Sequence, residues 1–159
     1  MAMHTWFECK IRYEKVMENG MQKKVTEPYL VDALSFTEAE ARIIKEMTPF
    51  ISGEFTVSDI KRANYSELFP SDEESADRWF KCKLIFITLD EKSGAEKKTS
   101  TQVLVQAADL RDAVKKLDEG MKGTMADYQI GMVSETPLMD VYPYSAEPND
   151  KPEFDPSKA

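Results

Sequence analysis

The sequence predicts an α+β protein built from two tandem β-β-α-β units, forming an antiparallel sheet with both helices packed on one face. Three observations favour this fold class. The chain of 159 residues repeats itself at an offset of 73 or 74 residues. Its extended segments alternate between apolar and polar residues, and each copy contains a helix start signal followed by apolar residues at helical spacing. We therefore interpret the chain as a tandem duplication of one unit.

The repeat is defined by pairs of equivalent residues. The stretch from Trp6 to Lys10 (WFECK) returns as the stretch from Trp79 to Lys83 (WFKCK). The offset is 73 at both ends of the repeat and 74 in the middle, which predicts hairpin loops that differ by one residue. Further pairs are Leu30 with Leu104, Val31 with Val105, Ala39 with Ala113, Ile43 with Leu117, Met47 with Met121, Phe69 with Tyr142 and Pro70 with Pro143.

These spacings divide the chain into four predicted segments: a first repeat at 1–70, an acidic linker at 71–78, a second repeat at 79–143 and an irregular or disordered tail at 144–159. The linker carries four acids and one base. The tail contains three prolines spaced by four residues and no apolar periodicity, which is typical of irregular structure.

The first strand is expected at residues 6–16. Apolar and polar residues alternate there, so that Phe7, Cys9 and Ile11 share one face. The pair Asn19-Gly20 is a hairpin signal before a second strand at about residues 23–33. The same alternation after Trp79 predicts the equivalent strands of the second repeat. We expect these apolar faces to form the core.

A helix is expected after each hairpin. Ser35 and Glu38 form a capping-box pattern, and Asp109 and Asp112 occupy the equivalent places in the second copy. Long extended segments follow at residues 54–69 and 127–142. Each is long enough to bend or to split into two strands, so that six to eight strands are expected in total.

Composition restricts the classes of function. The net charge is −8, and much of the excess acidity lies in the linker and the tail, so a strongly basic nucleic-acid footprint is absent. No apolar run is long enough to cross a membrane, and the N-terminus lacks an apolar leader. Two cysteines at equivalent positions indicate a reduced protein. We expect a cytoplasmic location and no membrane partner.

Catalytic residues are scarce. The single histidine, His4, lies too near the N-terminus to be held rigidly as a base. No glycine-rich phosphate loop is present. Cys9 and Cys82 occupy inward strand positions, which favours core residues over metal ligands, because zinc needs four ligands. We therefore expect no enzymatic activity, no cofactor and no metal.

One group of residues indicates a possible ligand. An aromatic ring followed by two bases along an extended strand is the composition of a single-stranded nucleic-acid platform, where bases stack on rings and cations contact phosphates. The pattern occurs once in each repeat. The candidate nucleic-acid-binding residues are Trp6, Lys10, Arg12, Trp79, Lys81 and Lys83.

Two other interpretations remain open. Each tryptophan can simply pack at the start of its strand, with the lysines keeping a solvated face polar. Ile85 and Ile87 continue this face in the second repeat, which favours a partner that covers it. The alternative function is therefore a protein-interaction or assembly module that uses an exposed sheet face, including a homo-oligomer.

The chain also resembles a known family. The resemblance is carried by the stretch WFECKIRYEK from Trp6 to Lys15, by KKVTEPYLVDA from Lys23 to Ala33 and by SFTEAEA from Ser35 to Ala41. These residues are similar to the family called domain of unknown function 4494, found in gut Bacteroidetes and their phages. The resemblance extends to Pro143. It implies no catalytic or ligand residues, because the family is uncharacterised.

Overall fold

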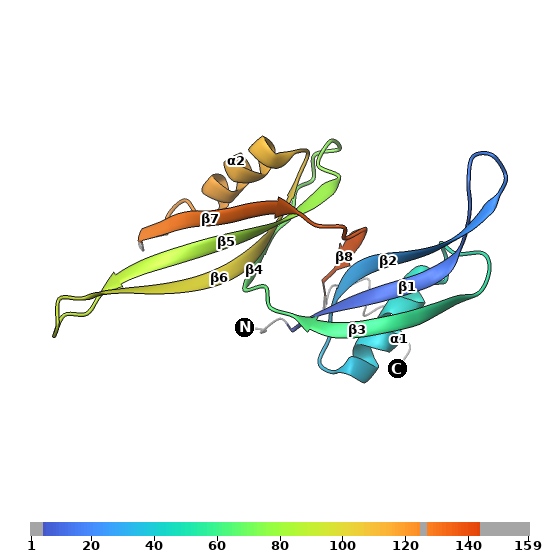
Figure 1. The fold of residues 1–159 in the computed structure, drawn as a ribbon, viewed down its shortest axis with the longest axis horizontal. Helices are drawn as coiled ribbons and strands as arrows, with labels where there is room; N and C mark the ends of the chain where they lie inside the picture. Colours follow the sequence, from blue (N-terminus) through green and yellow to red (C-terminus); the bar gives the residue numbers. More distant parts are fainter. Residues whose placement is uncertain (1–4, 125–126, 144–159) are drawn as a thin grey trace, which may run out of the picture. The chain divides into compact units, whose positions relative to one another are not determined.

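The computed structural model describes residues 5–124 and 127–143 of the chain. His4 and the predicted tail at 144–159 lie outside the described residues. The helices and strands, drawn in Figure 1, are β1 (Trp6–Val16), β2 (Gln22–Asp32), α1 (Phe36–Met47), β3 (Phe55–Ala63), β4 (Glu67–Phe69), β5 (Arg78–Leu89), β6 (Glu96–Ala107), α2 (Leu110–Gly120), β7 (Asp127–Glu135) and β8 (Asp140–Tyr142).

The described residues form an α+β structure, with two helices and two sheets dominated by antiparallel pairs. These residues divide into two compact units: a first unit of residues 5–62 with 141–143, and a second unit of residues 63–124 with 127–140. The prediction of one sheet carrying both helices is wrong, because the described strands form two four-stranded sheets, ordered β3-β1-β2-β8 and β4-β6-β5-β7. Alternation assigns the faces of a strand, but it does not determine which strand edges meet.

The core of the first unit lies between its sheet and α1. Strands β1 and β2 pair antiparallel, with Phe7 opposite Val31 and Cys9 opposite Tyr29. The predicted inward face is confirmed, since Phe7, Cys9 and Ile11 are fully buried. Helix α1 packs on β1 and β2 and contributes Ala39, Ile43 and Met47 to the same cluster, with Tyr29, Phe55 and Val57 half-buried around it.

The second unit is built from the same kinds of residue. Strands β5 and β6 pair antiparallel, and Phe80, Cys82 and Leu84 are buried beneath α2. The remaining buried members of this cluster are Val103, Val105, Ala107, Ala113 and Leu117, and half-buried Met121, Tyr128 and Ile130 pack against it. Every buried residue except Val103 lies 73 or 74 positions after a buried residue of the first cluster.

The two short strands are exchanged relative to the predicted repeats at 1–70 and 79–143. Strand β4, which follows β3 of the first unit, pairs in parallel with β6 of the second, with Phe69 opposite Val105. Strand β8, which follows β7 of the second unit, lies beside β2 of the first. Accordingly Phe69 packs on the second cluster, and Tyr142 packs on the first. Each sheet is therefore completed by the short strand of the other predicted repeat.

Both predicted helix starts are confirmed. The Ser35 Oγ accepts a hydrogen bond from the Glu38 backbone N–H at 3.1 Å, and the Glu38 carboxylate accepts one from the Leu34 N–H at 2.6 Å. In α2 the Asp109 carboxylate accepts from the Asp112 N–H at 2.8 Å. These contacts satisfy backbone donors that a helix N-terminus leaves without intrahelical partners.

The two hairpin turns differ in length by one residue, as the change of offset predicts. The first turn occupies residues 17–21 and the second occupies 90–95. Both contain a glycine with positive φ, 82° at Gly20 and 72° at Gly94, a conformation that favours glycine. In the first turn the Asn19 Oδ1 accepts a hydrogen bond from the Met21 N–H, and in the second the Asp90 Oδ1 accepts one from the Lys92 N–H.

Candidate functional site

The two tryptophans predicted to stack on bases are buried. Trp6 is 3% exposed and Trp79 is 5% exposed. Both lie on the sheet face turned away from the helix, since their neighbours Phe7 and Phe80 belong to the helix-facing clusters. A base can stack only on an accessible ring. Neither ring offers such a surface in this structure.

The predicted basic residues are more accessible than the rings. Arg12 and Lys83 are exposed, whereas Lys10 and Lys81 are half-buried. Within each strand the alternation places the tryptophan and its two bases on one face. The sequence therefore identified two faces with accessible cations, but not the burial of the aromatic residues beside them.

Leu30 and Leu104 explain part of this burial pattern. They lie on the same sheet faces as the tryptophans, one residue from core residues Val31 and Val105, and both are fully buried. Two consecutive apolar residues in a strand indicate that both faces of the sheet are covered at that point. This signal was present in the sequence and could have predicted the burial of the tryptophans.

The two cysteines are core residues, one in each unit. Cys9 and Cys82 are fully buried and unpaired with one another. Burial raises the pKa of the Cys9 thiol to about 12, with Glu8 adding to the effect, and it raises the pKa of Cys82 to about 11. Thiols with raised pKa are poor nucleophiles at neutral pH.

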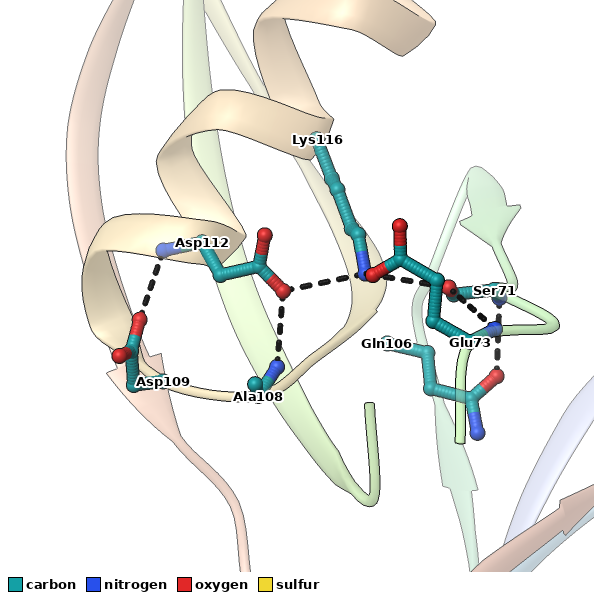
Figure 2. Close-up of polar contacts among 7 residues, drawn as sticks. All are labelled: Ser71, Glu73, Gln106, Ala108, Asp109, Asp112 and Lys116. Carbon is teal, nitrogen blue, oxygen red and sulfur yellow. Dashed lines mark hydrogen bonds and ion pairs between the residues drawn. The ribbon is translucent and has the colours of Figure 1, made fainter. Parts of the chain in front are cut away.

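A polar cluster that sequence analysis missed surrounds Lys116 on α2. The Lys116 Nζ lies 2.8 Å from the Glu73 carboxylate and 3.0 Å from the Asp112 carboxylate, and it donates to the Ser71 Oγ at 3.0 Å. Figure 2 shows the ammonium between Asp112 and the segment that contains Ser71 and Glu73. The backbone N–H of Ser71 donates to the Gln106 side chain at 2.9 Å. The segment predicted as an acidic linker at 71–78 is therefore attached to α2 and β6.

The Lys116 cluster is not arranged as a serine–lysine catalytic pair. Burial lowers the pKa of Lys116, but hydrogen bonds to Glu73 and Asp112 outweigh it and raise the pKa above its ordinary value. The hydrogen bond from the Ala108 N–H, together with Lys116, lowers the pKa of Asp112. The lysine is therefore held protonated and cannot act as a base toward Ser71.

An open groove of about 710 Å³ adjoins this cluster. Its charged lining residues are acidic apart from Lys116, whose charge is already paired. The lining residues are Phe69, Pro70, Ser71, Asp72, Glu73, Lys116, Glu119 and Gly120. We assign this region a structural role, because its one cation attaches the segment after β4 to α2.

Arg42 occupies the position equivalent to Lys116 in the first unit, 74 residues earlier. Its Nη2 donates to the Pro143 carbonyl at 3.4 Å. Pro143 immediately follows β8, as Pro70 and Ser71 follow β4. A cation from the helix thus contacts the end of the short strand in both units. This equivalence is the sequence signal that could have revealed Lys116.

A second polar cluster lies in the first unit, around Glu27 on β2. Glu27 accepts hydrogen bonds from the Tyr13 hydroxyl at 2.9 Å and the Tyr29 hydroxyl at 3.3 Å, and the Lys15 Nζ lies 3.6 Å from its other oxygen. Burial and the nearby Glu27 carboxylate raise the pKa of both tyrosines. The Glu27 oxygens are already occupied by these partners, so the cluster stabilises the hairpin.

The tip of the first hairpin is apolar and solvent-exposed. Val16 is 64% exposed, Met17 39% and Met21 66%; we call these three residues the apolar tip. The equivalent turn at residues 90–95 is polar (DEKSGA), and Leu89 is the exposed apolar residue beside it. The apolar tip adjoins two surface hollows of about 560 and 520 Å³. It is a candidate contact surface that sequence analysis did not select.

Among residues 5–124 and 127–143, no three His, Cys, Asp or Glu side chains are grouped to hold a metal ion. The two described helices are also too short and too polar to cross a membrane.

Comparison with known proteins gives a family but no activity. No curated protein matches the chain. A family described as a domain of unknown function (DUF4494) matches residues 5–144, which includes every helix and strand of both units. The chain therefore belongs to this family of unknown function.

Proposed function

We propose that the chain is a non-catalytic, cytoplasmic binding module that contacts a protein partner through the apolar tip. The observation that carries this proposal is the exposure of Met17 and Met21 beside Val16, since the turn of the second hairpin has charged and polar residues where the first turn has these two methionines. An exposed group of apolar side chains on a soluble domain commonly marks an interaction surface.

Turn geometry does not require the apolar tip. The first turn is held by backbone contacts between Met17 and Met21 and by the conformation of Gly20. The second turn is closed by equivalent backbone contacts between Asp90 and Ala95, with charged residues between them. Because the polar turn closes its hairpin as well, the apolar tip serves something other than folding.

The chemistry around the apolar tip indicates the kind of partner. Methionine side chains are flexible and adapt to irregular apolar pockets. Lys23 and Lys24 are exposed next to Met21, on the strand that leaves the turn. A partner that fits this surface has an apolar pocket with acidic groups at its rim.

The sheet face opposite α2 offers a second, weaker surface for the same function. Ile85 and Ile87 are half-buried there, and Met132 is exposed beside them on β7. The Ile85 side chain lies directly against the backbone of β7 at Gly131, because a Cβ at Gly131 would lie 2.9 Å from the Ile85 Cδ1. The face supports assembly with another subunit, the alternative derived from the sequence.

Single-stranded nucleic acid is a second candidate ligand. The accessible guanidinium of Arg12 and ammonium of Lys83 support phosphate contacts. Binding of this kind would depend on charge and not on stacking, because Trp6 and Trp79 are buried. We also propose that the two units arose by tandem duplication, which the equivalent spacing of the two cores supports.

Site-specific photo-crosslinking tests the apolar tip. A photoreactive phenylalanine derivative is placed at Met21, or at exposed Lys92 in the polar turn as the matched control. In extracts of the cells that express the chain, we expect discrete protein adducts from position 21 and none from 92. The double variant Val16→Ser, Met17→Ser should abolish these adducts. Equal adducts from both positions would overturn the proposal.

An oligonucleotide titration tests the second candidate. Lys83→Ala should flatten the dependence of log affinity on log salt by roughly 0.7 for a lost single-strand phosphate contact. Lys45→Ala, an exposed lysine on α1, is the matched control and should leave the slope unchanged. No binding of a thymidine oligonucleotide at low salt would eliminate this candidate.

A further inference from the structure

The turn of the first hairpin contains an asparagine followed by a glycine. The chain has three asparagines, and Asn19 is the one that precedes a glycine, whereas Asn64 precedes a tyrosine and Asn149 an aspartate. Asn19 and Gly20 are both exposed. Apart from the adjacent residues, no atom lies within 4 Å of the position that a Cβ at Gly20 would occupy. The side from which a side chain would shield the Gly20 nitrogen is therefore open.

The Asn19 side chain folds back over Gly20. Its Oδ1 accepts a hydrogen bond from the Met21 N–H at 3.0 Å, which is a common turn contact of asparagine. An N–H that donates to a carbonyl oxygen stabilises the negative charge that develops on this oxygen when the carbonyl carbon is attacked. The Met21 N–H is therefore placed to assist an attack on the Asn19 Cγ.

The backbone contacts of the turn determine when the Gly20 nitrogen is accessible. The Gly20 N–H donates to the Met17 carbonyl at 2.9 Å, and this bond must open before the nitrogen can attack. The turn lies beyond the last residue pair of β1 and β2, which is Val16 with Gln22. An exposed turn at the end of a hairpin opens locally without unfolding of the domain. The folded chain therefore gives the nitrogen access to the side-chain amide.

We propose that Asn19 is a site of spontaneous deamidation. The backbone nitrogen of Gly20 loses its proton to water or hydroxide and forms a bond to the Asn19 Cγ. The side-chain nitrogen leaves as ammonia, and a cyclic imide remains. Water then opens this ring at either carbonyl, which leaves aspartate or isoaspartate at position 19. The reaction consumes one water, releases one ammonia and needs no oxidant or reductant.

The second hairpin shows that the turn does not require an amide. There the Ser93 Oγ accepts a hydrogen bond from the Ala95 N–H at 3.2 Å, and the Gly94 N–H donates to the Asp90 carbonyl at 2.7 Å. The same kinds of contact are therefore made by a hydroxyl that cannot deamidate. Asn19→Ser should accordingly keep the first turn folded and remove the reaction.

Both products change the apolar tip. Aspartate adds one negative charge between Met17 and Met21 to a chain whose net charge is already −8. Isoaspartate also lengthens the main chain by one carbon, which disturbs the hydrogen bond from the Met17 N–H to the Met21 carbonyl. A partner with acidic groups around its pocket would bind either product less tightly. This consequence rests on the proposed function, whereas the modification itself does not.

Peptide mass spectrometry on the aged full-length chain tests the modification. Folded chain and chain unfolded in urea are incubated side by side at mildly alkaline pH. In the folded chain we expect aspartate and isoaspartate at position 19, no reaction at exposed Asn64, and a rate that rises with pH. Asn19→Ser should give no product and should unfold at the wild-type temperature. Reaction in urea alone would show that the turn protects Asn19, and it would overturn the proposal, as would no reaction in either state.

Photo-crosslinking from position 21 tests the consequence for the apolar tip. The photoreactive residue is combined with Asn19→Asp, which is one of the products, or with Asn19→Ser as the matched control. We expect Asn19→Asp to lose most of the protein adducts and Asn19→Ser to retain them. Equal adducts from the two chains would overturn the effect on the contact. No adducts from either chain or from the chain that retains Asn19 would overturn the proposed function, and the peptide analysis would still decide the modification.

Discussion

The two units place similar apolar residues at equivalent core positions but differ at their surfaces. Phe7, Cys9 and Ile43 in the first core correspond to Phe80, Cys82 and Leu117 in the second. The hairpin turns diverge, with an apolar tip in the first unit and a charged turn in the second. The helix cation is an arginine at 42 and a lysine at 116. The buried apolar residues that the two units share are those that the fold requires. The surface residues that differ between the units are available for a function.

This comparison separates residues by physical role. A buried apolar group stabilises the unit roughly in proportion to the surface that it removes from water, so the cores have little freedom to diverge. An exposed side chain at a hairpin turn contributes little to stability. Stability therefore does not restrict the residues of the apolar tip, and selection for a contact with a partner can determine them.

Substitutions at the equivalent core positions 43 and 117 should give the largest losses of stability. Ile43→Ala and Leu117→Ala each remove most of a fully buried side chain, so each should lower the free energy of unfolding by about 2–5 kcal/mol. Chemical denaturation of the two variants measures this. A change near zero in either one would break the equivalence of the two cores.

Substitutions of the two turn glycines should give the next largest losses of stability. Gly20→Ala and Gly94→Ala keep the space around the new Cβ empty but place it at positive φ. Each should cost roughly 1 kcal/mol of unfolding free energy. If thermal unfolding shows a loss for one substitution only, the turns do not fold by the same rule.

Substitutions of the two helix cations, Arg42 and Lys116, should lower the free energy of unfolding by less than the glycine substitutions do. The two substitutions should also differ in how their effects depend on pH. The lowered pKa of Asp112 means that its contribution is present above its ordinary pKa of 3.8 and is lost as pH falls through the lower folded pKa. The raised pKa of Lys116 means that its contribution is present below 10.5 and is lost as pH rises through the higher folded pKa. The stability difference between wild type and Lys116→Met should thus shrink at both extremes.

Arg42→Met provides the matched control, because arginine stays charged to pH values above about 12. Its stability difference from wild type should persist at alkaline pH, where that of Lys116→Met declines. Denaturation curves collected across the pH range compare the two variants. Parallel alkaline profiles would contradict the assigned role of the Lys116 ammonium.

The apolar tip should give the smallest effect on stability. The triple variant Val16→Ser, Met17→Ser, Met21→Ser should change the free energy of unfolding by no more than about 0.5 kcal/mol, since these side chains are exposed. Calorimetry on this variant and on Leu89→Ser, the matched change in the second hairpin, measures the difference. A large loss for the first variant would show that the tip serves folding.

Local features of the fold could be predicted from the sequence. Alternation at Phe7, Cys9 and Ile11 identified the inward face, and the pattern of Ser35 and Glu38 identified the start of α1. These features depend on neighbouring residues, which a sequence states directly. The change of offset likewise located the longer second turn.

Long-range features could not be predicted in the same way. The residues of β4 and β8 indicate short strands, but β2 and β6 present nearly identical edges, Leu30-Val31 and Leu104-Val105, so the pattern does not say which edge each strand joins. The tryptophan faces were assigned correctly, but their burial depends on what covers the face. Lys116 was missed because its partners Ser71 and Glu73 lie more than 40 residues earlier.

Hydrogen exchange on two variants tests the exchanged strands most directly. Tyr142→Ala weakens β8, and Phe69→Ala weakens β4, each by removing one aromatic contact with a core. The exchanged arrangement predicts that Tyr142→Ala lowers amide protection in β2 and α1, whereas Phe69→Ala lowers it in β6 and α2. The opposite pattern, with Tyr142→Ala acting on β6 and α2 and Phe69→Ala acting on β2 and α1, would contradict the exchange.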